Sequence, residues 1–393
     1  MTQVKTGLDR LLEHPEAHLK PGSVGLLVNH TSVACDGRHS IVHFQTSRRH
    51  PLRKLFAPEH GLYGVDQDMI AISDQADPVS GLTIQSLYGD RADTLAPAAA
   101  GLDGLDNLVF DIQDIGSRYY TFIYTLANCM EACREAGVRV VVLDRPNPIN
   151  GEQVEGNQVD PACRSFVGQY PLLNRHGMTV GELAGMFNDA FGIGCDLEVV
   201  SMQGWERAMW YDQTGLYWVP PSPNMPTVAT ATVYPGMCLI EGTLLSEGRG
   251  TTLPFEQIGA AYIDPHRLSA RLEKENLPGV FCRPHFFKPM FHKGSGNVCG
   301  GVQLHVTDRA RFKPLLASVA VIRAIHAEHP EQFAWRTEPY EFVSDRPAID
   351  LLYGNPDLRK KLLPDGASLA DIEQSWHPDR EEFLKLRRQY LLY

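Results

Sequence analysis

Short, uninterrupted apolar runs recur through the first half of the chain, and they constrain the fold more than any other feature. Four of them have the length of strands, at residues 23–29, 52–58, 105–114 and 138–146, and LVF and VVVL are apolar at successive positions. Such runs suit strands that are buried on both faces, as in a parallel sheet covered by helices. Residues 118–137 lie between the last two runs and have a helical pattern that ends in glycine. This strand–helix–strand order predicts an α/β fold with a doubly wound, mostly parallel sheet.

The second half of the chain has a different texture, which predicts a second domain. With 393 residues the chain is long for one ordinary domain. A Pro-rich segment, VPPSPNMPT, precedes a Gly-rich segment, EGTLLSEGRGTT, and mixed strand and helix patterns follow. We therefore place a boundary near residue 230, so that residues 1–230 form the first domain and residues 231–393 form a smaller C-terminal α/β domain.

Charge and hydropathy exclude several classes of partner. The formal net charge of −11 would repel polyanions, so we expect no nucleic acid partner. No stretch is long and apolar enough to predict a membrane helix, so we expect no membrane association. The first 22 residues lack the features of a signal peptide, which predicts a cytoplasmic protein. A leader removed beforehand would leave a secreted or periplasmic location open, and the sequence makes no prediction about oligomeric state.

Polar residues follow each of the four predicted strands. These clusters are Asn29–Ser32, Pro58–Gly61, Gln113–Arg118 and Asp144–Pro148. In open parallel sheets, ligands bind beyond the carboxyl ends of the strands. The four clusters therefore predict a pocket at one edge of the sheet.

Glu59 is the first candidate for an acid that carries chemistry. It follows the second apolar run in FAPEHGLYG, where glycine allows a tight turn and apolar neighbours such as Phe56 favour a pocket. The alternative is a loop acid that caps a helix or pairs with a surface base.

Glu131 is the second candidate. On a helix with about 100° per residue, it shares a face with Tyr120 and Tyr124, and we expect this face to point inward or into a cleft. Buried acids are rare unless they are paired or functional. The alternative is a structural ion pair with Arg118 or Arg145.

Several motifs that indicate metal, nucleophile or cofactor chemistry are absent from the sequence. His30, His60 and His176 show no HxH or HExxH spacing, so we expect no metal site. No GxSxG, GxGxxG or P-loop is present, which argues against a serine hydrolase and predicts no cofactor. Eight cysteines without a CxxC pair indicate free, mostly buried thiols.

An ordered set of motifs nevertheless resembles a known family. The set comprises VNHTS, FAPEHGLYG, SLYG, DIQDIGSRYYT, DRPNPINGEQVEGN, HGMTVGELA, PPSPNMPT, YPGMCLIEGTLLSEGRGTT and CGGVQLHV. It resembles the exo-β-N-acetylmuramidase family NamZ, formerly the domain of unknown function DUF1343, from about residue 5 to the C-terminus. The resemblance implies a Rossmann-like first domain, a smaller second domain that completes the cleft, and release of terminal N-acetylmuramic acid from the non-reducing end of peptidoglycan fragments.

The resemblance also implies a pair of catalytic glutamates, which we place at Glu59 and Glu131. Glycosidic hydrolysis ordinarily needs an acid and a second carboxylate, and we assign Glu59 as the acid, although the roles could be exchanged. Arg118 or Arg249 would bind the lactyl carboxylate of a carbohydrate substrate. The remaining candidate substrate-binding residues are Asn29, His30, His60, Gln113, Tyr120 and Asn224, with Tyr119 as a second stacking ring. Two alternatives stay open: a non-catalytic muropeptide-binding protein, and a metal-dependent amidase or esterase on the same scaffold.

Overall fold

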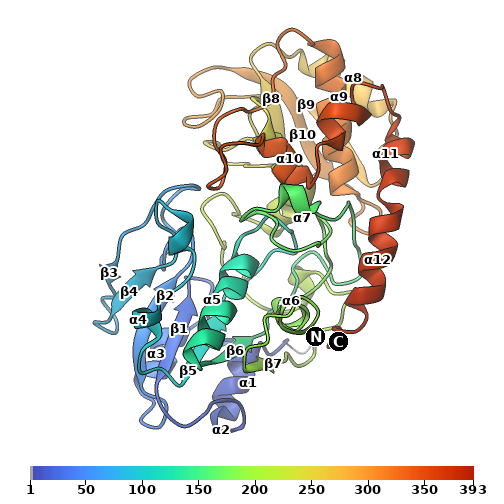
Figure 1. The fold of residues 1–393 in the computed structure, drawn as a ribbon. Helices are drawn as coiled ribbons and strands as arrows, with labels where there is room; N and C mark the ends of the chain where they lie inside the picture. The colour runs from blue at the N-terminus through green and yellow to red at the C-terminus, as the bar shows by residue number, and fades with distance from the viewer. Residues whose placement is uncertain (1–2) are drawn as a thin grey trace.

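A seven-stranded sheet forms the centre of the first domain. The computed structural model describes residues 3–393 and is shown in Figure 1. The strand order is β3-β4-β2-β1-β5-β6-β7, and every neighbouring pair is parallel except β3 with β4. Without the short β3, this is the strand order of the Rossmann fold. The strands are β1 (Val24–Val28), β2 (Leu52–Ala57), β3 (Gln75–Ala76), β4 (Thr83–Ser86), β5 (Asn107–Asp111), β6 (Arg139–Leu143) and β7 (Leu197–Val200).

Helices cover both faces of this sheet, which explains why its central strands are apolar throughout. In β6, Val140 and Val142 pack in one hydrophobic cluster with α5 (Phe122–Ala136) and α6 (Val180–Asp189). Val141 belongs to a second cluster with α1 (Gly7–Glu13) and α3 (Ser40–Gln45) on the other face. Successive side chains of a strand point to opposite faces, so both must be apolar. The predicted doubly wound, mostly parallel sheet is confirmed.

The second domain contains a smaller antiparallel sheet. Its order is β8-β10-β9, with β8 (Gln257–Ala260), β9 (Val280–Phe287) and β10 (Cys299–Val306). The helices of this half are α7 (Val228–Met237), α8 (Pro265–Glu273), α9 (Pro314–Glu328), α10 (Ala348–Tyr353), α11 (Leu369–Ser375) and α12 (His377–Arg387). The short elements of the chain are α2 (Pro15–His18), α4 (Ala99–Leu102), η1 (Ala92–Thr94), η2 (Pro161–Cys163), η3 (Tyr211–Gln213), η4 (Cys238–Gly242) and η5 (Leu358–Leu362). Along residues 3–393, no helix has both the length and the apolar character needed to cross a membrane.

The C-terminal end of the chain returns to the first domain. In Figure 1, α12 runs down beside the first domain and the two termini lie close together. Arg387 donates to the carbonyl of Gly177 at 2.7 Å, and the Tyr393 hydroxyl donates to Asp144 at the same distance. Residues 377–393 therefore pack with the first domain, although they follow the second in sequence.

Arg118 joins the two domains through backbone carbonyls. Its side chain is fully buried, and its guanidinium donates to the carbonyls of Asn157 at 2.6 Å and Leu172 at 2.8 Å in the first domain. It also donates to the carbonyls of Leu352 at 2.8 Å and Tyr353 at 3.0 Å at the end of α10. Burial lowers the pKa of this guanidinium. Because both terminal nitrogens donate to backbone carbonyls and the side chain is fully buried, Arg118 as it lies in this structure is not available to a substrate carboxylate.

We expect Arg118→Met to reduce the free energy of unfolding by about 3–5 kcal/mol, because four buried carbonyls would each lose a charged donor and those of Asn157 and Leu172 would lose the side-chain donor that they have. Urea denaturation followed by circular dichroism measures this change. Arg91→Met is the control, since the Arg91 side chain is 72% exposed and pairs with Asp93, which is 62% exposed. A similar loss in both variants would contradict a special role for Arg118.

Candidate active site

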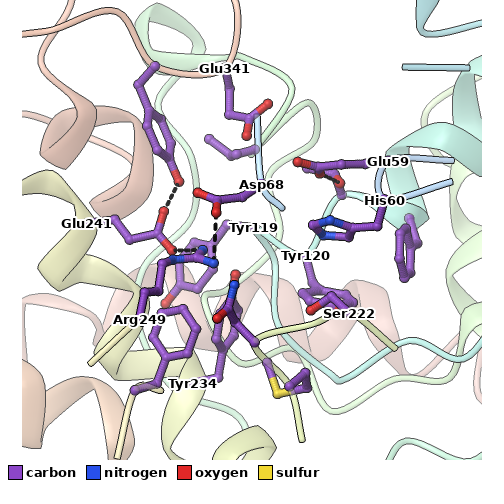
Figure 2. Close-up of a pocket in the computed structure, with 17 residues that line it drawn as sticks. Glu59, His60, Asp68, Tyr119, Tyr120, Ser222, Tyr234, Glu241, Arg249 and Glu341 are labelled. Carbon is purple, nitrogen blue, oxygen red and sulfur yellow. Dashed lines mark hydrogen bonds and ion pairs between the residues drawn. The ribbon is translucent and has the colours of Figure 1, made fainter. Parts of the chain in front are cut away.

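A small pocket lies between the two domains, beyond the carboxyl ends of β2 and β5 (Figure 2). The first domain contributes the segment after β2, the residues just before α5, and the Pro-rich segment. The second domain contributes η4, the Gly-rich segment and the turn at residues 340–343. The lining residues are Glu59, His60, Asp68, Tyr119, Tyr120, Thr121, Phe122, Val167, Ser222, Asn224, Met225, Tyr234, Glu241, Arg249, Phe255, Tyr340 and Glu341.

Glu59 is positioned by the turn that ends β2. The last three residues of β2 are buried, and His60 and Gly61 then adopt positive φ angles of 69° and 74°, which reverse the chain. The Glu59 carboxylate is 6% exposed and accepts hydrogen bonds from the Thr121 hydroxyl at 3.0 Å and the Met69 amide at 3.1 Å. Both donors are neutral, and no Lys or Arg of residues 3–393 forms an ion pair with this carboxylate.

Glu341 reaches the same pocket from the second domain. It lies at the tip of a two-residue turn in which Tyr340 and Val343 exchange backbone hydrogen bonds of 2.9 Å. Glu341 and Phe342 have φ angles of 46° and 67°, and left-handed backbone costs a non-glycine residue on the order of 1 kcal/mol or more. The Tyr88 hydroxyl donates to Glu341 at 3.0 Å. Burial raises the pKa of Glu341 well above its usual range, and the nearby charge of Glu59 raises it further.

Arg249 forms the charged end of the pocket. Its guanidinium pairs with Glu241 at 2.7 Å and Asp68 at 3.1 Å, as Figure 2 shows, and lies 3.4 Å from Glu247. Burial alone would lower the pKa of Arg249, but these three carboxylates raise it above its usual value. Glu247 is also paired with Lys293 at 2.7 Å. Although burial opposes it, the charges of Lys293 and Arg249 and the hydrogen bond with His292 hold the pKa of Glu247 well below its usual range.

Comparison with known proteins assigns the chain to a family. The model for the N-terminal domain of the exo-β-N-acetylmuramidase NamZ matches residues 24–229, and the model for the C-terminal domain matches residues 232–393. The chain belongs to the NamZ family. It is 44% identical over 391 residues to the peptidoglycan β-N-acetylmuramidase NamZ of Bacillus subtilis (strain 168), covering 100% of this chain and 92% of that protein. This confirms the resemblance found in the sequence motifs.

Two crystal structures of DUF1343 family proteins from Bacteroides fragilis NCTC 9343 share the fold. One superposes with a TM-score of 0.88 at 33% identity and covers 100% of both chains. The other has a TM-score of 0.75 at 28% identity and covers 100% of this chain and 99% of that one. Both domains of this NamZ-family chain therefore have experimentally observed counterparts.

Five of the candidate residues come together in the pocket of this NamZ-family chain. They are Glu59, His60, Tyr120, Asn224 and Arg249, and Tyr119 lines the pocket with them. The His60 ring bonds the carbonyl of Asp66 at 2.8 Å, and the Asn224 amide donates to Gln67 at 2.8 Å. Both contacts are made to the loop that follows Glu59.

Glu131 does not share this pocket. Its side chain is exposed and lines a neighbouring, open hollow on the outer side of α5, which Glu341 also lines. The face was expected to point inward or into a cleft, and Glu131 lies in this open hollow and not in the core for two reasons. Tyr120 precedes the first residue of α5, so helical spacing does not apply to it. Tyr124 is fully buried, but two turns later the same face reaches solvent beside the half-buried Tyr170.

Asn29, Gln113 and His30 also lie outside the pocket, which corrects their assignment as sugar contacts. Asn29 is fully buried, and its side-chain oxygen accepts from the Thr31 amide at 2.9 Å and hydroxyl at 2.6 Å. Gln113 donates to the carbonyls of Asp114 and Pro146, both at 2.7 Å. The His30 ring bonds the carbonyl of Pro220. These side chains hold the loops at the sheet edge together.

Several lining residues were not predicted from the sequence. Asp68 and Glu341 lie in segments without a helix or strand pattern, so no local signal identified them. Glu241 stands beside Arg249 in the Gly-rich segment, and that concentration of charge among glycines was its only signal. Across residues 3–393, no three His, Cys, Asp or Glu side chains are grouped so that they could hold a metal ion.

We expect Arg249→Met to lower the free energy of unfolding by about 3–5 kcal/mol, because Glu241 and Asp68 would be left as unpaired, partly or fully buried carboxylates. Without their partner, the folded-state pKa of each carboxyl would rise above its unfolded value. The stability contributed by their protonated forms is present at low pH and lost as the pH rises through the raised pKa. The deficit should therefore be larger at pH 8 than at pH 5 in urea denaturation. The exposed Arg283→Met provides the control, and a pH-independent deficit would contradict this account.

Proposed function

We propose that this chain hydrolyses the terminal β-linked N-acetylmuramic acid from the non-reducing end of peptidoglycan fragments. Membership of the NamZ family and similarity to the Bacillus enzyme over the whole chain support this proposal. The observation that carries it is the pair of carboxyls, Glu59 and Glu341, that line one pocket without a cationic partner in the described chain, while Arg249 lines the same pocket.

The two carboxyls have different environments. Glu341 is buried beside the charge of Glu59, so its pKa is raised and it can carry the proton that a general acid must donate. Glu59 accepts hydrogen bonds from the Thr121 hydroxyl and the Met69 amide, which leave it no proton donor of its own to offer in these contacts. We therefore assign Glu341 to protonate the glycosidic oxygen and Glu59 to activate water or attack the anomeric carbon. This reverses the role that the sequence suggested for Glu59 and replaces Glu131.

Arg249 supplies the selectivity for the muramic sugar. A lactyl carboxylate distinguishes N-acetylmuramic acid from N-acetylglucosamine, and a guanidinium binds a carboxylate through paired hydrogen bonds. Of the described residues, Arg249 is the one arginine or lysine that lines the pocket. Tyr119 and Tyr120 offer ring faces for the sugar, and Asn224 offers an amide for the acetamido group.

We expect Glu59→Gln and Glu341→Gln each to lower kcat on a natural muramyl disaccharide by about 10²–10⁴-fold, the usual contribution of a proton-transferring group. On a nitrophenyl β-N-acetylmuramide, Glu341→Gln should lose much less activity, because nitrophenolate leaves without protonation. Glu131→Gln is the matched control and should retain wild-type rates.

Equal losses in Glu131→Gln and Glu59→Gln would return Glu131 to the active site and contradict the assignment of Glu341. Binding of N-acetylmuramic acid without turnover by the wild type would favour a non-catalytic muropeptide-binding protein. Loss of hydrolysis in EDTA would favour a metal-dependent hydrolase, whereas two-carboxylate chemistry predicts no change.

The pH profile provides an independent test of the acid. Because the pKa of Glu341 is raised, its acid form persists to higher pH than that of an ordinary glutamate, and kcat/KM for the disaccharide should fall only as the pH rises through that raised value. The residual hydrolysis of the disaccharide by Glu341→Gln should lack this alkaline limb, and with the nitrophenyl substrate, which needs no acid, the wild type should lack it as well. An alkaline limb that is unchanged in Glu341→Gln would assign the acid to another group.

A further inference from the structure

Residues 61–74, the 61–74 loop, cover part of the pocket. The loop contains no helix or strand, and its outer side is in solvent, with Val65 73% exposed and Ile70 46% exposed. Its middle residues face inward, and Figure 2 shows Asp68 pointing at Arg249. The loop is therefore a thin cover over the pocket.

Three consecutive residues of the 61–74 loop each contact a different pocket group. Gln67 accepts from the Asn224 amide at 2.8 Å, and Asp68 pairs with Arg249 at 3.1 Å. The Met69 amide donates to Glu59 at 3.1 Å. One short segment of the chain therefore occupies Asn224 and Arg249, which we assign to substrate binding, and Glu59, which we assign to catalysis.

The space beneath the loop is too small for a sugar. The free volume of the pocket is about 40 Å³, and a single water needs roughly 10–15 Å³ measured in the same way. A few waters fit, whereas an N-acetylated pyranose ring with a lactyl group does not. Substrate binding therefore requires part of the lining to move, and the 61–74 loop has an exposed outer side and contacts three of the pocket groups.

The charges around Arg249 show which contact can be exchanged. Glu241, Glu247 and Asp68 surround Arg249, and Lys293 adds one further cation. The three carboxylates already pair with these two cations and with the His292 ring, which lies 3.1 Å from Glu247 and 3.9 Å from Asp68, so a fourth carboxylate could bind Arg249 only by replacing one of them. The side chains of Glu241 and Glu247 are 5% and 1% exposed, whereas that of Asp68 is 15% exposed. Asp68 is the carboxylate that can leave.

We propose that Asp68 is a specificity-determining residue that occupies the place of the substrate carboxylate on Arg249. An incoming lactyl carboxylate replaces Asp68, and the 61–74 loop moves away with it. This inference rests on the proposed function, because it takes the ligand to be a carboxylate-bearing sugar.

The replacement of Asp68 by a substrate carboxylate also changes the hydrogen bonding of Glu59. Since Met69 directly follows Asp68, displacement of Asp68 withdraws the Met69 amide from the Glu59 carboxylate. A hydrogen bond to a carboxylate stabilises its charged form and reduces its basicity, so its removal makes Glu59 a better base. A sugar without a carboxylate cannot replace Asp68, and Glu59 then keeps its hydrogen bond. Selectivity and activation are coupled by two adjacent residues.

The test compares Asp68→Asn with Asp66→Asn. Both variants remove one negative charge from the same loop, but in the described chain Asp66 forms no ion pair. Calorimetry with free N-acetylmuramic acid should give at least about fivefold tighter binding in Asp68→Asn, because the closed state no longer competes for Arg249. Asp66→Asn should bind as the wild type does. In Asp68→Asn, the preference for a nitrophenyl β-N-acetylmuramide over the β-N-acetylglucosaminide should also fall.

Weaker binding of N-acetylmuramic acid by Asp68→Asn would overturn the proposal, as would an equal effect of Asp66→Asn or an unchanged substrate preference. The binding measurement needs no turnover, so it separates this inference from the proposed function. If the wild type binds N-acetylmuramic acid without hydrolysing muramides, the proposed hydrolysis fails while the exchange at Arg249 is still decided by the two variants.

Discussion

The four carbonyls around the Arg118 guanidinium are the contact on which the pocket depends. Two belong to the first domain and two to the end of α10 in the second. Arg118 directly precedes Tyr119, Tyr120 and Thr121, which line the pocket and include the donor to Glu59. The same short segment therefore joins the domains and forms a pocket wall. Glu59 comes from one domain and Glu341 from the other, so the two carboxyls face a common space only while this junction is intact.

The fold of the first domain was predictable because the information is local. An apolar run such as VVVL in β6 is buried on both faces wherever it lies in a doubly wound sheet, and Gly137 ends α5 in the left-handed conformation that its position suggested. The course of the last residues was not predictable. Residues 377–393 have an ordinary helical pattern, and contacts such as Tyr393 with Asp144 bring them to the first domain. A pattern of apolar residues shows that one side of a helix is buried, but it does not show which part of the molecule that side packs against.

The site was predictable only in part, for the same reason. Glu59 follows a buried strand and precedes a glycine, and these local features are sufficient to present a side chain at the sheet edge. The prediction that Glu131 lies in the same pocket as Glu59 failed because the burial of a helix face depends on how far its neighbours extend along it. The sequence could not show that Arg118 is buried between the domains, because a guanidinium that binds carbonyls has the same sequence signature as one that binds a ligand. Glu341 had no signal, since its partner Tyr88 is 253 residues away in the chain.

The distribution of charge divides the pocket into two ends that suit different tasks. Arg249 and Lys293 form ion pairs with Asp68, Glu241 and Glu247 at one end. Glu59 and Glu341 contact neutral donors at the other. A cation beside Glu341 would stabilise its ionised form and lower its pKa, which would remove the proton that an acid must donate. Recognition of a substrate carboxylate, in contrast, requires a cation such as Arg249 in the same pocket. Both requirements can be met in one small pocket only if the cations and the proton donor stand apart, and the second domain supplies that separation by carrying Glu341 on the turn at residues 340–343 and Arg249 on the Gly-rich segment.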